Sequence, residues 1–541
     1  MRSVFLVLVL GACAGGMDAG GAADEAPGGG GVSFGGAQDI GEFRSILERG
    51  DIPDPDSLDA NGFFNEHFNA APPAACGNTL CLTPGLSVGR DWLTGKHQAT
   101  LQIAVHTPVD PSTYERLPMN LVVVVDRSGS MQEDNRLEKV KVGLHTLVDN
   151  LRDEDRVSLI SFDHAVRTDV QLRSELDRPR LHAAIDELTP GGSTNIYDAL
   201  QAGFEMIGVE PGNERQHRII FLSDGMATAG ITDRSSIIEM SRGAISRGIG
   251  LTTIGVGNSF DVELMRGLAE SGAGNYYFLE DGAAAGEVFT EELDYFMSPL
   301  ALDVRIEASA GAGWTFDEVV GSRLWSAQQK KGSMAIPAVF LASRESQEPG
   351  NGRRGGGSMI FVRLEPTGDA TSKVATLTLS YRMPGSSERV TETVTLDYAN
   401  DPRETPADPH LSSAEMAERY AMYNLFIGLR YATKTYGGCA MSALQATRRY
   451  AADWNERHPD PDITADLVLV DQYIANLRAH GTLEGSELAS CPKADEPYWP
   501  QYDDDYAYDD HGHAHCSAGG GTAGWLVLVG AIGFVVRRRR R

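Results

Sequence analysis

Residues 121–131 read LVVVVDRSGSM, and this stretch decides the fold prediction. Five apolar residues in a row are typical of a strand that is buried on both faces of a parallel sheet. Asp126, Ser128 and Ser130 follow, so one carboxylate and two hydroxyls lie in the turn after the strand. Comparable apolar runs occur at residues 157–162, 219–222, 251–256 and 276–279.

Segments with helical periodicity separate these runs. Apolar residues recur at helical spacing at Leu137, Val140, Leu144, Leu147 and Leu151. Helices also fit residues 196–207, 234–247 and 261–270. Strands that alternate with helices predict an α/β fold, a doubly wound and mainly parallel sheet over residues 119–298. Ligands of such sheets bind beyond the carboxyl ends of the strands.

Three loops can deliver oxygen ligands to that edge. The first carries Asp126, Ser128 and Ser130, and the second contains Thr194 in the run GGSTN. The third contains Asp224 in the turn Ser223-Asp224-Gly225, which directly follows the apolar run 219–222. Carboxylates and hydroxyls suit Mg²⁺, with Mn²⁺ or Ca²⁺ as alternatives, and the loops contain no soft ligand. Taken singly, each fragment also fits a turn that caps a helix.

Together the three loops resemble the metal-ion-dependent adhesion site (MIDAS) of von Willebrand factor type A (VWA) domains, because the pattern Asp-x-Ser-x-Ser, then Thr, then Asp is complete. The resemblance implies that Asp126, Ser128 and Ser130 hold a divalent cation with Thr194 and Asp224. It also implies that a vacant coordination position accepts an Asp or Glu side chain from a protein partner.

The flanking regions indicate two further structural layers. Residues 41–118 form an N-terminal region whose strand near 97–107 is expected to join a β-sandwich at 299–400, next to which the central domain is inserted. Residues 401–494 are expected to be helical, and Ser412 with Glu415 fits a capping box before the first helix.

Composition limits the classes of function. The 541 residues carry a net charge of −28, and 42% of them are hydrophobic. Broad nucleic-acid binding is therefore not expected, since phosphate contacts need a cationic surface. The hydrophobic content fits a globular chain of several domains rather than a disordered chain or one that crosses a membrane many times.

Four cysteines outside the two ends of the chain suggest disulfides. Pairing of Cys76 with Cys81 and of Cys439 with Cys491 is favoured because each pair shares a local segment. Two disulfides would fit an oxidising compartment, and four buried free thiols are the alternative.

The N-terminal residues predict export. Arg2, an apolar run and a small-residue site form a signal peptide over residues 1–13, and residues 10–13 (LGAC) resemble a lipobox that would place lipid on Cys13. Plain secretion is the alternative. Residues 14–40 are rich in Gly and Ala without apolar periodicity, which predicts a flexible tether.

The C-terminal residues predict an acidic spacer at 495–515 and a tail at 516–541. The tail, with Cys516, a short apolar stretch and five arginines, resembles a MYXO-CTERM sorting signal, which implies processing near Cys516 and delivery to the cell surface. Use of both terminal anchors stays open. His511, His513 and His515 in the spacer could bind Zn²⁺, Ni²⁺ or Cu²⁺, or could simply be solvated.

The whole order resembles bacterial YfbK-like VWA lipoproteins, also labelled calcium-activated-chloride-channel-like. The channel label gains no support, because no segment before residue 522 is long and apolar enough to span a membrane. The sequence therefore predicts a membrane-anchored periplasmic or surface binding protein without enzyme activity. An envelope scaffold with a structural metal is the alternative, and a metal-dependent hydrolase is a remote one, since no Gly-x-Ser-x-Gly, P-loop or His-Glu-x-x-His motif occurs.

Overall fold

The structure is a computed structural model of the chain, which divides into two units, Met1–Pro492 and Lys493–Arg541. It describes residues 30–67, 76–109, 117–208, 215–245, 248–257, 260–272, 274–279, 288–289, 299–322, 324–342, 357–384 and 386–492. All of these belong to the first unit. The predicted lipidation site Cys13, the predicted sorting site Cys516 and the three spacer histidines lie outside the described residues.

A seven-stranded sheet in the order β2-β11-β10-β9-β6-β7-β8 forms the central domain. Its strands are β2 (Gly36–Ala37), β6 (Met119–Asp126), β7 (Arg156–Phe162), β8 (Val166–Val170), β9 (Gln216–Ser223), β10 (Ile249–Val256) and β11 (Asn275–Leu279). All neighbours are parallel except β7 and β8. The five predicted strands are all present, and β2 and β8 extend the sheet at its two edges.

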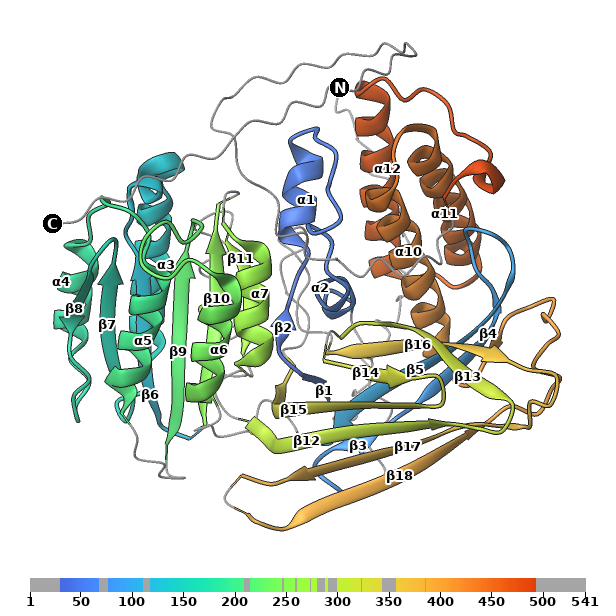
Figure 1. Ribbon diagram of the computed structural model, residues 1–541, viewed down its shortest axis with the longest axis horizontal. Coiled ribbons are helices and arrows are strands. Elements are labelled where there is room, and N and C mark those ends of the chain that lie inside the picture. Colours follow the sequence, from blue (N-terminus) through green and yellow to red (C-terminus); the bar gives the residue numbers. More distant parts are fainter. Residues whose placement is uncertain are drawn as a thin grey trace, which may run out of the picture. The chain divides into compact units, whose positions relative to one another are not determined.

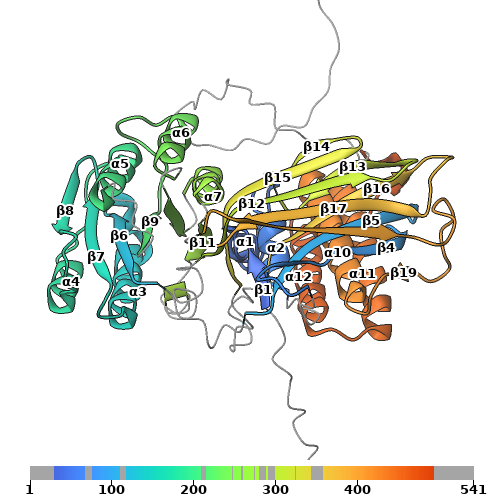
Figure 2. The ribbon, with the colours of Figure 1, turned by 90° about the horizontal axis from the view of Figure 1, so that it is seen from below.

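Helices cover both faces of this sheet (Figure 2). They are α3 (Arg136–Asn150), α4 (Arg178–Asp186), α5 (Ile196–Ile207), α6 (Arg234–Ile245) and α7 (Val262–Ser271). The side chains of β6 alternate between two cores: Val123 packs with residues of α3 and α4, and Val124 packs with residues of α5 and α7. The doubly wound α/β prediction is confirmed, and the all-apolar run is explained by burial on both faces.

The flanking β region is one twelve-stranded antiparallel sheet. The strands are β1 (Gly30–Ser33), β3 (Cys81–Leu82), β4 (Gly85–Arg90), β5 (His97–Thr107), β12 (Pro299–Ala310), β13 (Trp314–Val320), β14 (Ser326–Gln328), β15 (Lys331–Leu341), β16 (Met359–Pro366), β17 (Lys373–Arg382), β18 (Arg389–Asp397) and β19 (His410–Leu411). The main path runs β13-β16-β5-β1-β15-β12-β17-β18.

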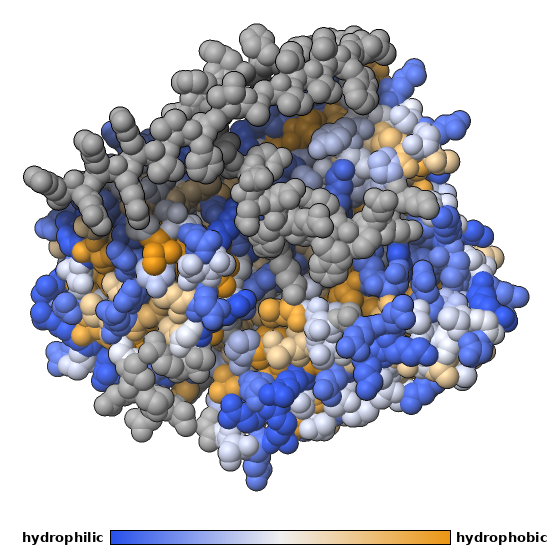
Figure 3. Space-filling view, in the orientation of Figure 1, coloured by the Kyte–Doolittle hydropathy of each residue, from blue (hydrophilic) through white to orange (hydrophobic). Residues whose placement is uncertain are grey.

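The two halves of this long sheet share one apolar core, as expected for a sandwich. Leu101 and Ile103 of β5 belong to the same cluster as Val304 and Ile306 of β12 and Leu377 of β17. Along β18, exposed and partly buried residues alternate. Hydrophilic residues accordingly cover the lower part of Figure 3, where the hairpin of β17 and β18 lies in Figure 1.

The tether predicted over residues 14–40 is wrong for residues 30–40, which the structure shows as paired and mostly buried chain. Strand β1 joins the two halves of the long sheet by pairing with β5 and β15. After only two intervening residues, β2 pairs with β11 of the central sheet (Figure 1). The turn between them needs glycine: Gly35 has a φ of +83°, and a β-carbon there would stand 2.6 Å from the Gly274 carbonyl oxygen. Val32 and Phe34 are buried in the core of the long sheet, but so few apolar residues among glycines gave this segment the composition of a linker.

Five helices make a third layer. They are α1 (Gly41–Glu48), α2 (Ala60–Asn65), α10 (Met416–Lys434), α11 (Gly437–Arg457) and α12 (Pro461–Ala479). Phe43 of α1 and Phe63 of α2 share a core with Phe426 of α10, Leu444 of α11 and Tyr473 of α12. None of the helices in the described part of the chain is long and apolar enough to cross a membrane.

The predicted capping box before α10 is wrong. No side chain caps that helix, and the hydroxyl of Ser412 instead accepts a hydrogen bond of 2.8 Å from the backbone N–H of Leu86 on β4. A tertiary contact has thus replaced the local one. The cysteines are paired as favoured from the sequence, Cys76 with Cys81 and Cys439 with Cys491.

Candidate metal centre

Two neighbouring strands bring two of the three loops together. Strands β6 and β9 run parallel, with Val125 opposite Leu222, so both end at the same edge of the sheet. Asp126 is the last residue of β6, and Asp224 follows the end of β9 directly. Both carboxylates are fully buried. The third loop, with Thr194, leads into α5, whose first turn is capped by Asn195.

Four of the five predicted ligands form a connected network of oxygens. The backbone N–H of Ser128 donates to Asp126 Oδ1 (2.8 Å). The hydroxyl oxygens of Ser128 and Ser130 lie 3.1 Å apart, and Ser130 donates to Asp224 Oδ1 (2.8 Å). Carboxylate and hydroxyl oxygens from two loops therefore converge on one place.

Thr194 lies beside this network. Its hydroxyl oxygen and that of Ser130 stand 3.5 and 3.8 Å from the point that a β-carbon at Gly225 would occupy. Any larger residue at position 225 would therefore touch both hydroxyls. Backbone bonds hold the threonine in place: its N–H donates to the hydroxyl of Thr228 (2.9 Å), and its carbonyl accepts from Thr228 (2.9 Å) and Ala229 (3.1 Å).

The first and second loops also brace each other through the backbone. Gly191 N–H donates to the carbonyl of Arg127 (2.7 Å), and Gly129 N–H donates to that of Gly192 (3.0 Å). Gly192 has a φ of +81°, and a β-carbon there would stand 2.8 Å from His164 Nδ1. Glycine at this position lets the loop approach closely.

Two residues of the site had no assigned role in the sequence prediction. The Ser223 hydroxyl donates to Asp126 Oδ2 (2.5 Å), and the buried Arg136 donates from Nη1 to Asp224 Oδ2 (2.9 Å). Ser223 precedes Asp224 in the same quoted turn, so a signal existed. For Arg136 no sequence signal existed. It is the first residue of α3, and the two residues before it, Asp134 and Asn135, have left-handed backbone conformations with φ of 48° and 55°.

Electrostatics distinguish the two carboxylates. Burial raises the pKa of Asp126 to about 6, although the Ser223 hydroxyl and the Ser128 N–H oppose the shift. Within the described residues no arginine, lysine or histidine forms an ion pair with Asp126, whereas Arg136 neutralises Asp224. A buried carboxylate without a cation is costly. Its oxygens and the adjacent hydroxyls are the hard donors that Mg²⁺ prefers, so the residues fit a divalent cation.

Comparison with known proteins identifies the family of the central domain. Residues 120–291 match the sequence profile of the family described as von Willebrand factor type A domain. This segment is a VWA domain. The loops described above thus belong to the VWA domain, whereas the long antiparallel sheet and the layer of α1, α2, α10, α11 and α12 lie outside it.

Relatives resemble about a third of the chain. The protein YfbK of Escherichia coli (strain K12) is 32% identical over 209 residues, which cover 37% of this chain and 35% of YfbK. Inter-alpha-trypsin inhibitor heavy chain H2 of Sus scrofa is 28% identical over 174 residues, covering 30% of this chain and 18% of that protein. The chain thus spans about a third or less of the length of these two relatives.

One solved structure aligns with a larger part of the chain than these relatives do. The von Willebrand factor type A protein from Catenulispora acidiphila superimposes with a TM-score of 0.47 at 15% sequence identity, covering 70% of this chain and 88% of that chain.

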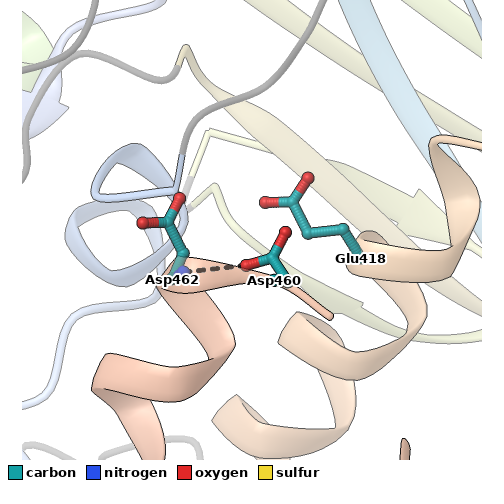
Figure 4. A group of neighbouring side chains, drawn as sticks. All are labelled: Glu418, Asp460 and Asp462. Atoms are coloured by element: carbon teal, nitrogen blue, oxygen red, sulfur yellow. Dashed lines mark hydrogen bonds between the residues drawn. The ribbon is translucent and has the colours of Figure 1, made fainter. Parts of the chain in front are cut away.

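A second acidic group lies outside the VWA domain, where Glu418, Asp460 and Asp462 come together (Figure 4). Asp460 has a structural role there, since its carboxylate caps α12 by accepting from the N–H groups of Asp462 (2.8 Å) and Ile463 (3.0 Å). Burial raises the pKa of Glu418 to about 8, with His67 opposing and Asp460 adding to the shift. We assign no ligand to this group.

This shifted pKa makes stability depend on pH. Glu418 binds a proton more tightly in the folded chain than at its ordinary pKa of 4.5, so folding loses free energy as the pH rises from about 4.5 to about 8. We expect Glu418→Gln to remove this loss, raising the free energy of unfolding at pH 8 by roughly 4 kcal/mol relative to wild type, with little difference at pH 4.5. Urea unfolding at the two pH values measures it, with the exposed Glu456→Gln as control. Parallel pH profiles of wild type and Glu418→Gln would refute the expectation.

Proposed function

We propose that the protein is an exported, membrane-anchored binding protein, without enzyme activity, whose VWA domain captures an acidic side chain of a protein partner through a divalent cation. Asp126, Ser128, Ser130, Thr194 and Asp224 would hold the ion, with Mg²⁺ preferred over Mn²⁺ or Ca²⁺. The observation that supports this most directly is the buried oxygen network around Asp126, a carboxylate to which no described residue supplies a cation.

Charge counting favours a ligand that carries a carboxylate. The two aspartates and Arg136 together carry one net negative charge. A bound dication would supply an electrophilic centre whose charge these residues only partly neutralise. Arg136 therefore tunes the site, because without it the two carboxylates would cancel the charge of the ion. An anionic partner group gains electrostatic attraction at such a partly desolvated place.

The contacts of the two serines argue against catalysis. Ser128 and Ser130 contact one another and the two aspartates. Among the described residues, no histidine or lysine forms a hydrogen bond with either hydroxyl, and the nearby His164 pairs with Asp163 at 3.0 Å. A serine nucleophile needs a base within hydrogen-bond reach. Binding is thus the better supported role.

Export is proposed from the ends of the chain and from the disulfides. Lipid on Cys13, recognition of the tail near Cys516, or both would anchor the protein to a membrane or the cell surface. The bonds Cys76–Cys81 and Cys439–Cys491 are typical of an oxidising compartment, which supports a place outside the cytoplasm.

Metal dependence of partner capture tests the proposal. The full chain is immobilised and incubated with envelope extract in Mg²⁺, in EDTA, and in EDTA followed by excess Mg²⁺, Mn²⁺ or Ca²⁺. We expect a partner that is released by EDTA and recaptured with Mg²⁺. A partner that stays bound in EDTA while the melting temperature falls would refute capture through the ion and support the alternative of an envelope scaffold with a structural metal.

A further inference from the structure

A pair of histidines lies on the surface of the VWA domain, on two helices that cover the same face of its sheet. His145 is in α3 and His182 is in α4. The planes of their rings are inclined by only 20°, and the ring centroids lie 5.0 Å apart. The two Nδ1 atoms face each other at 2.7 Å.

The opposite nitrogen of each ring faces a carboxylate. His145 Nε2 lies 3.1 Å from Asp186 Oδ1, and His182 Nε2 lies 3.2 Å from Asp149 Oδ1. A carboxylate accepts a hydrogen bond, so each ring carries its proton on Nε2. With neutral rings in this tautomer, both Nδ1 atoms direct lone pairs at each other, so either a shared proton or a metal ion must lie between them.

Histidines that bind metals usually show this arrangement: the ring nitrogen that does not bind the metal donates its N–H to a carboxylate. This hydrogen bond fixes the tautomer and raises the basicity of the ligand nitrogen. We propose that His145 and His182 together bind a transition-metal ion of the Zn²⁺ class. Zn–N bonds of about 2.0 to 2.1 Å at a tetrahedral angle place the two nitrogens about 3.3 Å apart. To bind the ion, the two Nδ1 atoms must move apart by roughly half an ångström from their present 2.7 Å, and the rings must turn so that both lone pairs point at the ion.

The surroundings complete the site. Each ring is about one-third exposed, 32% for His145 and 31% for His182, so water reaches the remaining coordination positions. The two aspartates supply two negative charges against the two positive charges of the ion. Imidazole favours Zn²⁺, Cu²⁺ and Ni²⁺ over Mg²⁺, so this pair and the oxygen site at Asp126 select different metals. A bound ion would tie α4 to α3, the helix whose first residue, Arg136, holds Asp224.

Zinc titration of the full chain tests the proposal. The parent protein carries His511→Ala, His513→Ala and His515→Ala, so that the spacer histidines cannot contribute, and excess Mg²⁺ occupies the oxygen site. Calorimetry should show one Zn²⁺ fewer per chain for His145→Gln and for His182→Gln than for the parent. His480→Gln, which removes another exposed histidine, should keep the full number. Asp149→Asn should weaken binding at the pair about tenfold.

A second measurement needs no substitution at the pair. The electron paramagnetic resonance spectrum of the parent protein with one equivalent of Cu²⁺ should show coupling to two ring nitrogens. Equal Zn²⁺ stoichiometry and affinity in the parent and in the double variant His145→Gln/His182→Gln would overturn the proposal, as would a Cu²⁺ spectrum without two coupled nitrogens. In either case the pair only shares a proton.

Discussion

Asp126→Ala is expected to abolish metal-dependent binding of the partner while the fold persists. The carboxylate is fully buried, and its oxygens meet the hydroxyl of Ser223 and the N–H of Ser128 rather than a cation. The substitution therefore removes a negative charge that would hold the ion, and alanine offers no oxygen in its place. Losing one partner of a buried charge pair costs about 2 to 5 kcal/mol, so affinity for the partner should fall by at least about 30-fold.

Surface plasmon resonance in Mg²⁺ against a partner identified by capture measures this loss. Glu205→Ala, which removes an exposed carboxylate from α5 of the same domain, is the matched control and should bind like wild type. In EDTA the melting temperatures of wild type and Asp126→Ala should be similar, because burial already disfavours the charged carboxylate in the metal-free protein. Undiminished binding by Asp126→Ala would remove the basis of the proposed function.

Arg266→Met is expected to destabilise the fold by about 3 to 5 kcal/mol, the typical cost of leaving a buried charge without its partner. Arg266 lies in α7 of the VWA domain and is almost completely buried. Its guanidinium lies 3.7 Å from Asp59 and 3.9 Å from Glu42, and it donates to the Asp56 carbonyl (2.6 Å). These partners all belong to the N-terminal region, so one side chain links two parts of the chain.

Urea unfolding at pH 7 measures this effect, with Arg242→Met as control. Arg242 is exposed on α6 and pairs with Glu239 at 3.5 Å, so its loss should change stability by less than about 1 kcal/mol. Burial already raises the pKa of Glu42 to about 7 although Arg266 opposes the shift. A loss for Arg266→Met as small as that of the control would show that the buried cation contributes no net stability.

The fold of the central domain could be predicted from sequence because its determinants are local. A run such as residues 121–125 is apolar throughout since its side chains alternate between two cores, and polar side chains follow at the strand end. The same reasoning led to the prediction that Asp126, Ser128, Ser130 and Asp224 lie together at the strand ends. Arg136 could not be found in this way, since only the tertiary fold brings its guanidinium to Asp224.

The segment at residues 30–37 shows the limit of such reasoning. Its strands are short and pair through backbone hydrogen bonds, which any sequence can form. Gly35 and Gly36 both have positive φ, and Gly35 also meets the close approach of the Gly274 carbonyl. Hydrophobic periodicity, the main signal for strands, is limited there to Val32 and Phe34, which is too short a run to predict a strand. Which sheet edge such a segment joins is decided by partners far along the chain.

The shared segment also has a consequence for biosynthesis. Residues 30–37 leave the ribosome before every strand that they pair with, and the last of these, β15 (Lys331–Leu341), is translated only after the whole VWA domain. Domains generally fold as units during synthesis, N-terminal first. Here, instead, residues 30–37 must stay incompletely paired until β15 has been synthesised. Because this segment is rich in glycine and has few apolar residues, it is a poor target for premature association.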